Sequence, residues 1–130
     1  MTTPFMCLFI MIVLVYVIAG IGVYFRSQQL GSIDAEHPRV QALELRDVAA
    51  RAYAAHQNAW EALAVFTVAV VVNHLAGADP GLAATTSVVF LVARVGHAAA
   101  YIANKPILRT LSFLVGIVSC VTLLGSAIAT

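Results

Sequence analysis

The chain has 130 residues, of which 62% are hydrophobic and only 10% are charged, and its mean hydropathy is +0.95. These values lie far outside the range of soluble globular domains and indicate an integral membrane protein. The formal net charge is +1, and no basic stripe alternates with aromatic residues, which argues against a nucleic-acid partner.

Four stretches are apolar enough to span a bilayer, which takes about 20 residues. In chain order they are residues 4–25, 59–77, 82–103 and 107–129. The first stretch has no basic segment before it and no clear small-residue cleavage site after it, so we interpret it as a retained helix rather than a signal peptide. We therefore expect an all-α membrane protein with a single domain over residues 1–130, folded as an up-down-up-down bundle of four transmembrane helices.

The only substantial polar segment, residues 26–57, lies between the first two helices. Its first part has the composition of a turn. From Val40 its pattern is helical, and we expect this part to run without a break into the second helix as a cytoplasmic extension. The other connections, residues 79–81 and 104–106, are short, and Pro106 suits the first turn of a helix.

Basic residues gather at one end of this topology. All seven belong to the polar segment, the second short connection or the helix ends beside them: Arg26, Arg39, Arg46, Arg51, Arg94, Lys105 and Arg109. The positive-inside rule places these two connections in the cytoplasm and both termini on the other side. We expect a multi-pass protein of a bacterial inner membrane in this orientation.

Polar residues recur on one face of the second and third helices, because residues three, four and seven apart share a helical face. The second helix presents Arg51, Ala54, Asn58 and Glu61, and the third presents Arg94, His97 and Tyr101. Antiparallel spans bring these side chains to the cytoplasmic half of the membrane, where Arg109 begins the fourth helix. Charges cost roughly 2.5 to 3.5 kcal/mol in a membrane helix and usually mark a functional site.

Purely structural readings of these residues also remain open. Glu61 and Arg94 can form an ion pair that fixes the helix register, His97 can be a packing residue, and Tyr101 can be an aromatic of the membrane interface. Neither Cys7 nor Cys120 suggests a disulfide, and no spacing of His or Cys indicates a metal site. The cluster suits an anionic ligand, since arginines bind carboxylates and a nearby arginine stabilises a thiolate.

Two strings carry a resemblance to a known family. They are Arg51-Ala-Tyr-Ala-Ala-His56-Gln-Asn58-Ala-Trp-Glu61 and Arg94-Val-Gly-His97-Ala-Ala-Ala-Tyr101, followed by Pro106 and Arg109. In this combination the chain resembles the MAPEG family, membrane-associated proteins of eicosanoid and glutathione metabolism. It looks closest to the branch that contains microsomal prostaglandin E synthase and a microsomal glutathione transferase.

The resemblance implies a four-helix subunit of a homotrimer that binds glutathione between neighbouring subunits near the cytoplasmic side. It implies that Arg109 stabilises the glutathione thiolate. The residues that it places at the glutathione site are Arg26, Asn58, Glu61, His97, Tyr101 and Thr110, and we expect Arg94 to complete the wall of this site together with His97 and Tyr101.

The chain departs from the family pattern at a few positions. Ala54 stands where enzymes of the family carry an arginine, and we consider Arg51, one turn earlier on the same face, as its substitute. Gln57 replaces an arginine of the synthase, and Phe113 replaces a tyrosine. The anion-binding side of the predicted pocket is therefore poorer than in the well-known enzymes.

The leading hypothesis is a homotrimeric transferase or peroxidase that uses glutathione against hydrophobic electrophiles or lipid hydroperoxides. The alternative is a non-catalytic membrane trimer that binds lipid, or that uses the polar cluster only for assembly, and Ala54 favours it. A small transporter fits less well, because the polar residues occupy one half of the membrane and no helix is visibly broken at its midplane.

Overall fold

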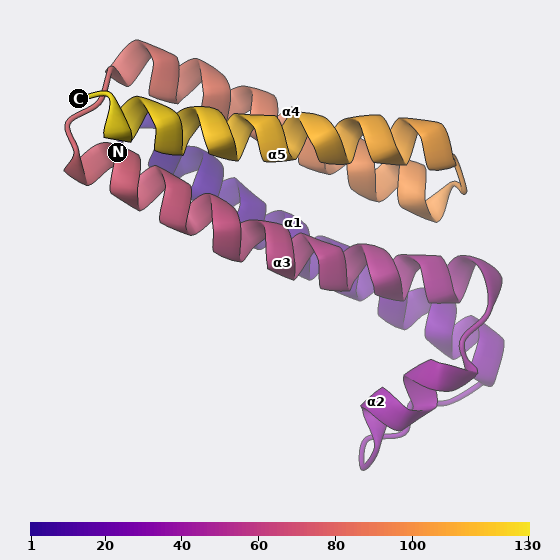
Figure 1. The fold of residues 1–130 in the computed structure, drawn as a ribbon. Helices are drawn as coiled ribbons and strands as arrows, with labels where there is room; N and C mark the ends of the chain where they lie inside the picture. The colour runs from indigo at the N-terminus through magenta and orange to yellow at the C-terminus, as the bar shows by residue number, and fades with distance from the viewer.

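The computed structural model describes all 130 residues, and every regular element in it is helical. Four long helices, α1 (Thr3–Leu30), α3 (Asp47–Leu75), α4 (Pro80–Ile102) and α5 (Pro106–Ile128), form the bundle of Figure 1. All four are long and apolar enough to cross a membrane. The predicted bundle of four spanning helices is therefore confirmed.

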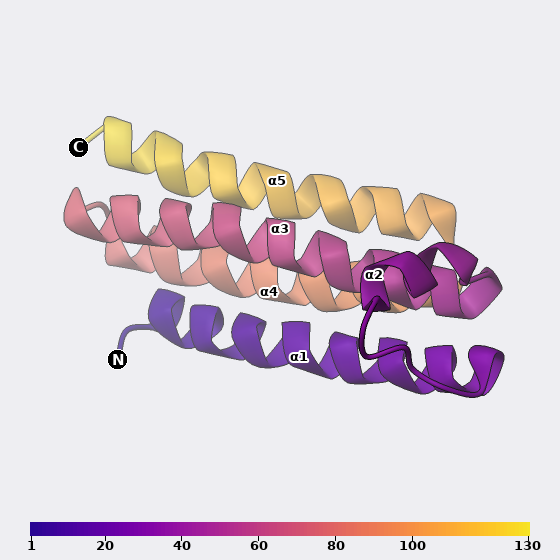
Figure 2. The same cartoon turned by 90° about the horizontal axis from the view of Figure 1, so that it is seen from below.

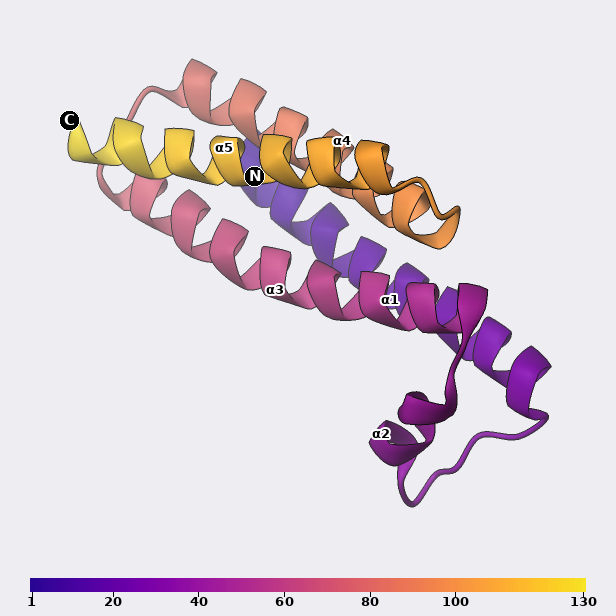
Figure 3. The same cartoon turned by 45° about the vertical axis from the view of Figure 1, so that its right-hand side comes forward.

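The long helices alternate in direction, so both chain termini lie at one end of the bundle (Figures 1 and 2). Helices α3 and α4 are central, since each of them packs against the other three long helices. The opposite end carries the turn between α4 and α5 and the short helix α2 (Pro38–Gln41), which projects away from the bundle in Figure 3. The basic side chains between positions 26 and 51 therefore lie at the same end of the bundle as Lys105.

Small side chains on α3 allow its neighbours to approach closely. Ala52, Ala55 and Ala69 are fully buried in its inner face. Phe66 of α3 stacks on Phe90 of α4, with ring centroids 3.9 Å apart. The opposite faces of the four helices expose mostly aliphatic side chains, which suits contact with lipid.

The prediction of an unbroken helix from Val40 into the second spanning helix is wrong. Residues 38–44 form α2 and one 3₁₀ turn, η1 (Ala42–Glu44), after which Leu45 and Arg46 are extended and α3 begins at Asp47. The side chain of Gln29 stabilises this break: it donates to the Arg46 carbonyl (3.2 Å) and accepts from the Arg46 amide (2.9 Å). The Arg46 amide is thereby paired with a residue of α1, while the Arg46 carbonyl also accepts from the Ala50 amide at the start of α3. Leu45 is buried beside this contact.

The first helix is longer than expected and continues past residue 25 to Leu30. It ends at Gly31, whose φ of 73° is the left-handed conformation that favours glycine as a helix cap. With 28 residues, α1 measures about 42 Å, which exceeds a hydrocarbon core of about 30 Å. Arg26, near its end, can therefore reach the membrane interface.

Candidate functional site

The face predicted on α3 and α4 brings its polar side chains into direct contact. Asn58 lies between the two charged residues: its amide nitrogen donates to Glu61 Oε2 (3.3 Å), and its amide oxygen accepts from Arg94 Nη2 (2.5 Å). The same guanidinium nitrogen lies 3.4 Å from the Asn58 carbonyl oxygen. Glu61 and Arg94 are thus linked through an amide side chain.

Arg94 is deeply buried, with 3% of its surface exposed, and its guanidinium is only partly satisfied. Its Nε atom is buried and has no hydrogen-bond partner. Leaving such a donor without a partner costs about 1 to 3 kcal/mol, and more in a charged group. Arg94 Nε is therefore the one polar side-chain atom of Arg94 and His97 that is buried without a hydrogen-bond partner.

His97 is equally buried and continues the network along α4. Its Nδ1 atom lies 3.3 Å from Arg94 Nη2. Because a guanidinium can only donate, Nδ1 is the acceptor in this contact, and the hydrogen of the neutral ring is assigned to Nε2. The ring thus keeps one donor for another partner.

Aromatic contacts carry the network on to α5. The ring of Tyr101 meets that of His97 edge to face, with centroids 5.6 Å apart. The guanidinium carbon of Arg109 lies 4.5 Å from the centre of the Tyr101 ring, within the range of a cation–π interaction. Six residues from three helices therefore form one continuous chain of contacts, the polar network: Glu61, Asn58, Arg94, His97, Tyr101 and Arg109.

A cleft of about 330 Å³ opens beside one end of this network, between α3, α4 and α5. Asn58, Glu61 and Arg94 line one part of it. The rest of its wall is mostly apolar and consists of Ala62, Val65, Phe90, Phe113, Gly116, Ile117, Cys120, Val121 and Leu124. Such a cleft can hold a molecule with a polar head and an apolar body.

The structure does not bring the other three predicted site residues into the polar network. Arg51 donates from Nε to the carbonyl oxygen of Ile102 (3.1 Å) and so caps the end of α4. Arg26, on α1, donates to the Pro38 carbonyl oxygen (3.2 Å). Thr110 is exposed on α5. Within one subunit, Arg51 therefore has a structural role. It does not substitute for the arginine that enzymes of the family carry at the position of Ala54.

The sequence interpretation placed Phe113 at the predicted pocket but missed Gly116 and Cys120, which α5 also contributes to the cleft. Phe113, Gly116 and Cys120 follow Arg109 at intervals of four, three and four residues and so continue its helical face. Gly116 matters for packing, because a Cβ atom there would lie 3.4 Å from Arg94 Cδ. Extending the face of Arg109 along the helix would have identified all three.

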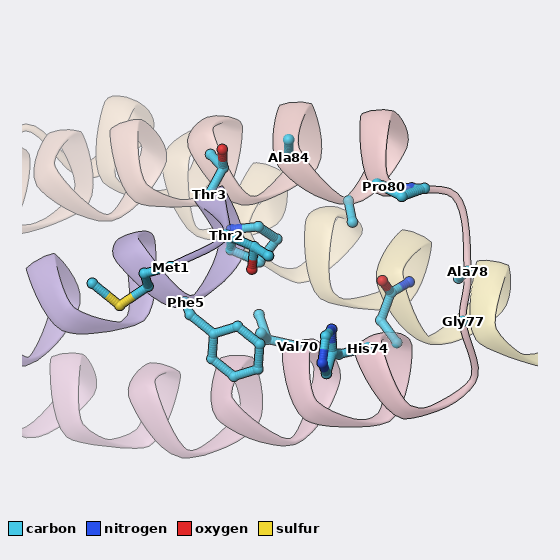
Figure 4. Close-up of a pocket in the computed structure, with 13 residues that line it drawn as sticks. Met1, Thr2, Thr3, Phe5, Val70, His74, Gly77, Ala78, Pro80 and Ala84 are labelled. Carbon is cyan, nitrogen blue, oxygen red and sulfur yellow. The ribbon is translucent and has the colours of Figure 1, made fainter.

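A larger cavity, of about 500 Å³, lies at the opposite end of the bundle, beside the N-terminus (Figure 4). Phe5 and His74 face each other in it edge to face, with ring centroids 5.0 Å apart. Asn73, which also lines it, uses its amide nitrogen to bind Leu123 and Ser126 of α5. His74 is the only titratable side chain that lines this cavity.

The comparison with protein families decides the assignment: the model of the MAPEG family matches residues 3–129. The chain belongs to the MAPEG family. The match covers all four long helices and includes the whole polar network. This confirms the resemblance read from the two sequence strings, at the level of the family. The comparison with curated proteins gives no match.

Membership fixes the broad class of this MAPEG protein. It is an integral, multi-pass membrane protein of a family that is associated with glutathione and eicosanoid metabolism and that forms trimers. No group of three or more His, Cys, Asp or Glu side chains in the structure could hold a metal ion.

Proposed function

We propose that this MAPEG protein is a glutathione-dependent membrane transferase or peroxidase that acts on hydrophobic electrophiles or lipid hydroperoxides. The observation that supports the proposal is that the polar network and the apolar cleft meet at the buried side chain of Arg94. A polar cosubstrate and an apolar partner can thus be held side by side at one place in the bundle.

The groups of the network suit glutathione, which carries two carboxylates, an ammonium group and a thiol. The unpaired Nε of Arg94 offers a donor to an anion, and the carboxylate of Glu61 offers an acceptor to a cation. Asn58 holds these two residues in register through its two hydrogen bonds. Glutathione itself would supply the nucleophilic sulfur, since the network contains no cysteine or serine.

Arg109 is the residue that we assign to the thiolate. It is half-buried in the first turn of α5, and its guanidinium rests on the Tyr101 ring without a hydrogen-bond partner of its own. A fixed positive charge beside a thiol favours the deprotonated form. We infer that Arg109 stabilises the thiolate, while His97 and Tyr101 complete the wall of the site.

The position of Glu61 supports a trimer as the working form. Its side chain is exposed at the surface of a single subunit, although it lies within a membrane-spanning helix. An ionised carboxylate that faces lipid is costly, and a neighbouring subunit would cover it. We propose that subunits meet beside Glu61 and that residues such as Arg26 and Thr110, outside the network of one subunit, reach the site from a neighbour.

The thiolate absorbance of the purified protein on addition of glutathione tests this proposal. We expect a thiolate band in the parent protein and its loss in Arg109→Ala. A charge-assisted interaction of about 1.5 to 3 kcal/mol corresponds to a roughly tenfold to hundredfold lower thiolate fraction. Arg39→Ala is the matched control, because Arg39 is an exposed arginine of α2 outside the network.

The alternative is a non-catalytic trimer that binds lipid or uses the polar network only for assembly. Ala54 favours it, as does the use of Arg51 as a cap of α4, which takes that arginine away from an anion. If glutathione neither binds nor gives a thiolate band, this alternative replaces the enzyme. Binding that is acquired in Ala54→Arg would show that the chain has lost an ancestral anion contact.

A further inference from the structure

The cavity beside the N-terminus, which we call the terminal cavity, lies apart from the polar network (Figure 4). Its volume of about 500 Å³ is within the range of small-molecule sites in proteins. His74, on its wall, lies about 20 Å beyond Glu61 along the axis of α3. A molecule in the terminal cavity would therefore not compete with a molecule at the polar network.

The terminal cavity opens at the end of the bundle. Its wall is formed by the start of α1, the end of α3, the turn after α3 and the start of α4. Thr2, His74 and Gly77 belong to this wall and are exposed. The neighbouring subunit that we place beside Glu61 would approach the side of the bundle in its other half, so it leaves this opening uncovered.

Asn73 contributes an unused hydrogen-bond acceptor to this wall. It is 4% exposed, and its amide nitrogen donates to the Leu123 carbonyl oxygen (2.9 Å) and the Ser126 hydroxyl (2.7 Å). Since a carbonyl can only accept, the nitrogen must face α5, and the amide oxygen points away from α5. This oxygen accepts no hydrogen bond, yet the only fully buried side-chain atoms without a partner are Ser87 Oγ and Arg94 Nε. The oxygen therefore keeps accessible surface in the cavity that Asn73 lines.

Two aromatic rings stand in the same wall. Phe5 and His74 meet edge to face, with centroids 5.0 Å apart, and neither ring is fully buried (Figure 4). Aromatic rings favour a further ring in stacked or edge-to-face contact. Val70 and Ala83, both buried, add an apolar surface. The wall thus combines an aromatic and apolar lining with a single buried acceptor.

The charge of a suitable ligand follows from the same groups. An acceptor oxygen needs a donor, which excludes ionised carboxylates and phosphates. No Asp or Glu side chain lines the terminal cavity, so a cation would find no acidic side chain as a counter-charge. These conditions select a neutral molecule that carries a ring and a hydrogen-bond donor.

We propose that the terminal cavity is a binding site for neutral, apolar phenols. The phenol hydroxyl donates to Asn73 Oδ1, and the ring packs beside Phe5 and His74. The bound molecule contacts α1, α3 and α4 at once and so stabilises one end of the bundle. This site is independent of glutathione and of the polar network.

The test uses the full-length protein in detergent and two photoreactive probes: a phenol that carries a trifluoromethyldiazirine, and its methyl ether, which has no hydroxyl hydrogen. Peptide mass spectrometry locates the attached probe after irradiation. We expect the phenol to label the segments around positions 1–5 and 70–84 in a saturable manner. The methyl ether should need a roughly tenfold higher concentration there, because it leaves the amide oxygen without a donor. Labelling of the outer helix faces, which contact detergent, corrects for partition of each probe into the micelle.

A matched pair of variants separates the cavity from the surrounding surface. Ala78 lines the cavity and is 8% exposed, so Ala78→Phe should fill the cavity and abolish saturable labelling. Ala76→Phe is the control, because Ala76 is exposed in the same turn and lies outside the lining. Equal labelling by the two probes after correction would overturn the proposal, as would labelling that Ala78→Phe leaves unchanged. The comparison of the probes uses the unaltered chain, so it decides the question even where Ala78→Phe does not fold.

Discussion

At the scale of single residues, Asn58 is the member of the network that joins its two oppositely charged residues. The sequence suggested a direct pair between Glu61 and Arg94, but the structure links them through the amide of Asn58. An amide can do this because it donates from nitrogen and accepts at oxygen at the same time. A carboxylate or an aliphatic residue at this position could satisfy only one of the two charges, or neither.

Replacing Asn58 by Ala should therefore destabilise the protein. Arg94 Nη2 would lose its shortest hydrogen bond while it stays buried, which is expected to cost about 1 to 3 kcal/mol. Unfolding of the protein in mixed detergent measures the change. Gln57→Ala is the control, since the neighbouring Gln57 is exposed and binds only the Tyr53 hydroxyl. Equal stability of the two variants would contradict this role of Asn58.

The helical periodicity located Asn58, Arg94 and His97 on facing sides of two helices, and the structure brings all three into contact. It did not indicate that Cys120 lines the cleft, because an apolar residue in an apolar helix carries no signal of its own. Whether such a side chain packs in the core or lines a cleft depends on the residues that surround it in space.

At the scale of elements, α3 is tied to α5 at the end of the bundle that is remote from the polar network. The amide nitrogen of Asn73 donates to the Leu123 carbonyl oxygen (2.9 Å) and to the Ser126 hydroxyl (2.7 Å). Hydrogen bonds between helices in a membrane contribute about 0.6 to 2 kcal/mol. This contact fixes how far α5 extends along α3 and so helps to hold the cleft wall in place.

We expect Asn73→Leu to lower the free energy of unfolding by about 1 to 2 kcal/mol, because two interhelical hydrogen bonds are lost. Unfolding in mixed detergent tests this. Thr122→Val serves as the control, since the Thr122 hydroxyl bonds only to a carbonyl of its own helix, that of Val118. An equally large loss in the control would show that the α3–α5 contact is not responsible.

The start of α3 shows why the predicted beginning of this helix was wrong. The pattern after Val40 is helical, yet Gln29 binds both backbone groups of Arg46 and keeps that residue extended. These hydrogen bonds join residues that are 17 positions apart. A local pattern cannot reveal a competing partner on another helix.

At the scale of the whole molecule, the fold gathers the basic connections at one end of the bundle. The polar segment and the turn at Lys105 lie at one end, and both termini lie at the other (Figure 1). Basic connections are retained on the cytoplasmic side, which would place the polar network in the cytoplasmic half of the bilayer.

Reporter cysteines in a Cys7→Ser, Cys120→Ser background test this orientation. Leu43→Cys lies at the basic end, where the parent side chain is 84% exposed, and Ala76→Cys lies at the other end in the exposed turn after α3. With a membrane-impermeant maleimide on intact cells, we expect Ala76→Cys to react and Leu43→Cys to react only after permeabilisation. The reverse pattern would refute the orientation.

The sequence by itself determined the membrane class, the four spans, the alternation of direction and the polar faces of α3 and α4. Hydropathy and helical periodicity are properties of neighbouring residues, so they can be read along the chain. The tertiary structure alone decided that Asn58 links the two charges, that Arg51 caps α4, that Gln29 interrupts the helix before α3, and that Cys120 lines a cleft. Each of these depends on how far one helix is shifted and rotated against another, and that is set by side-chain packing between segments distant in sequence.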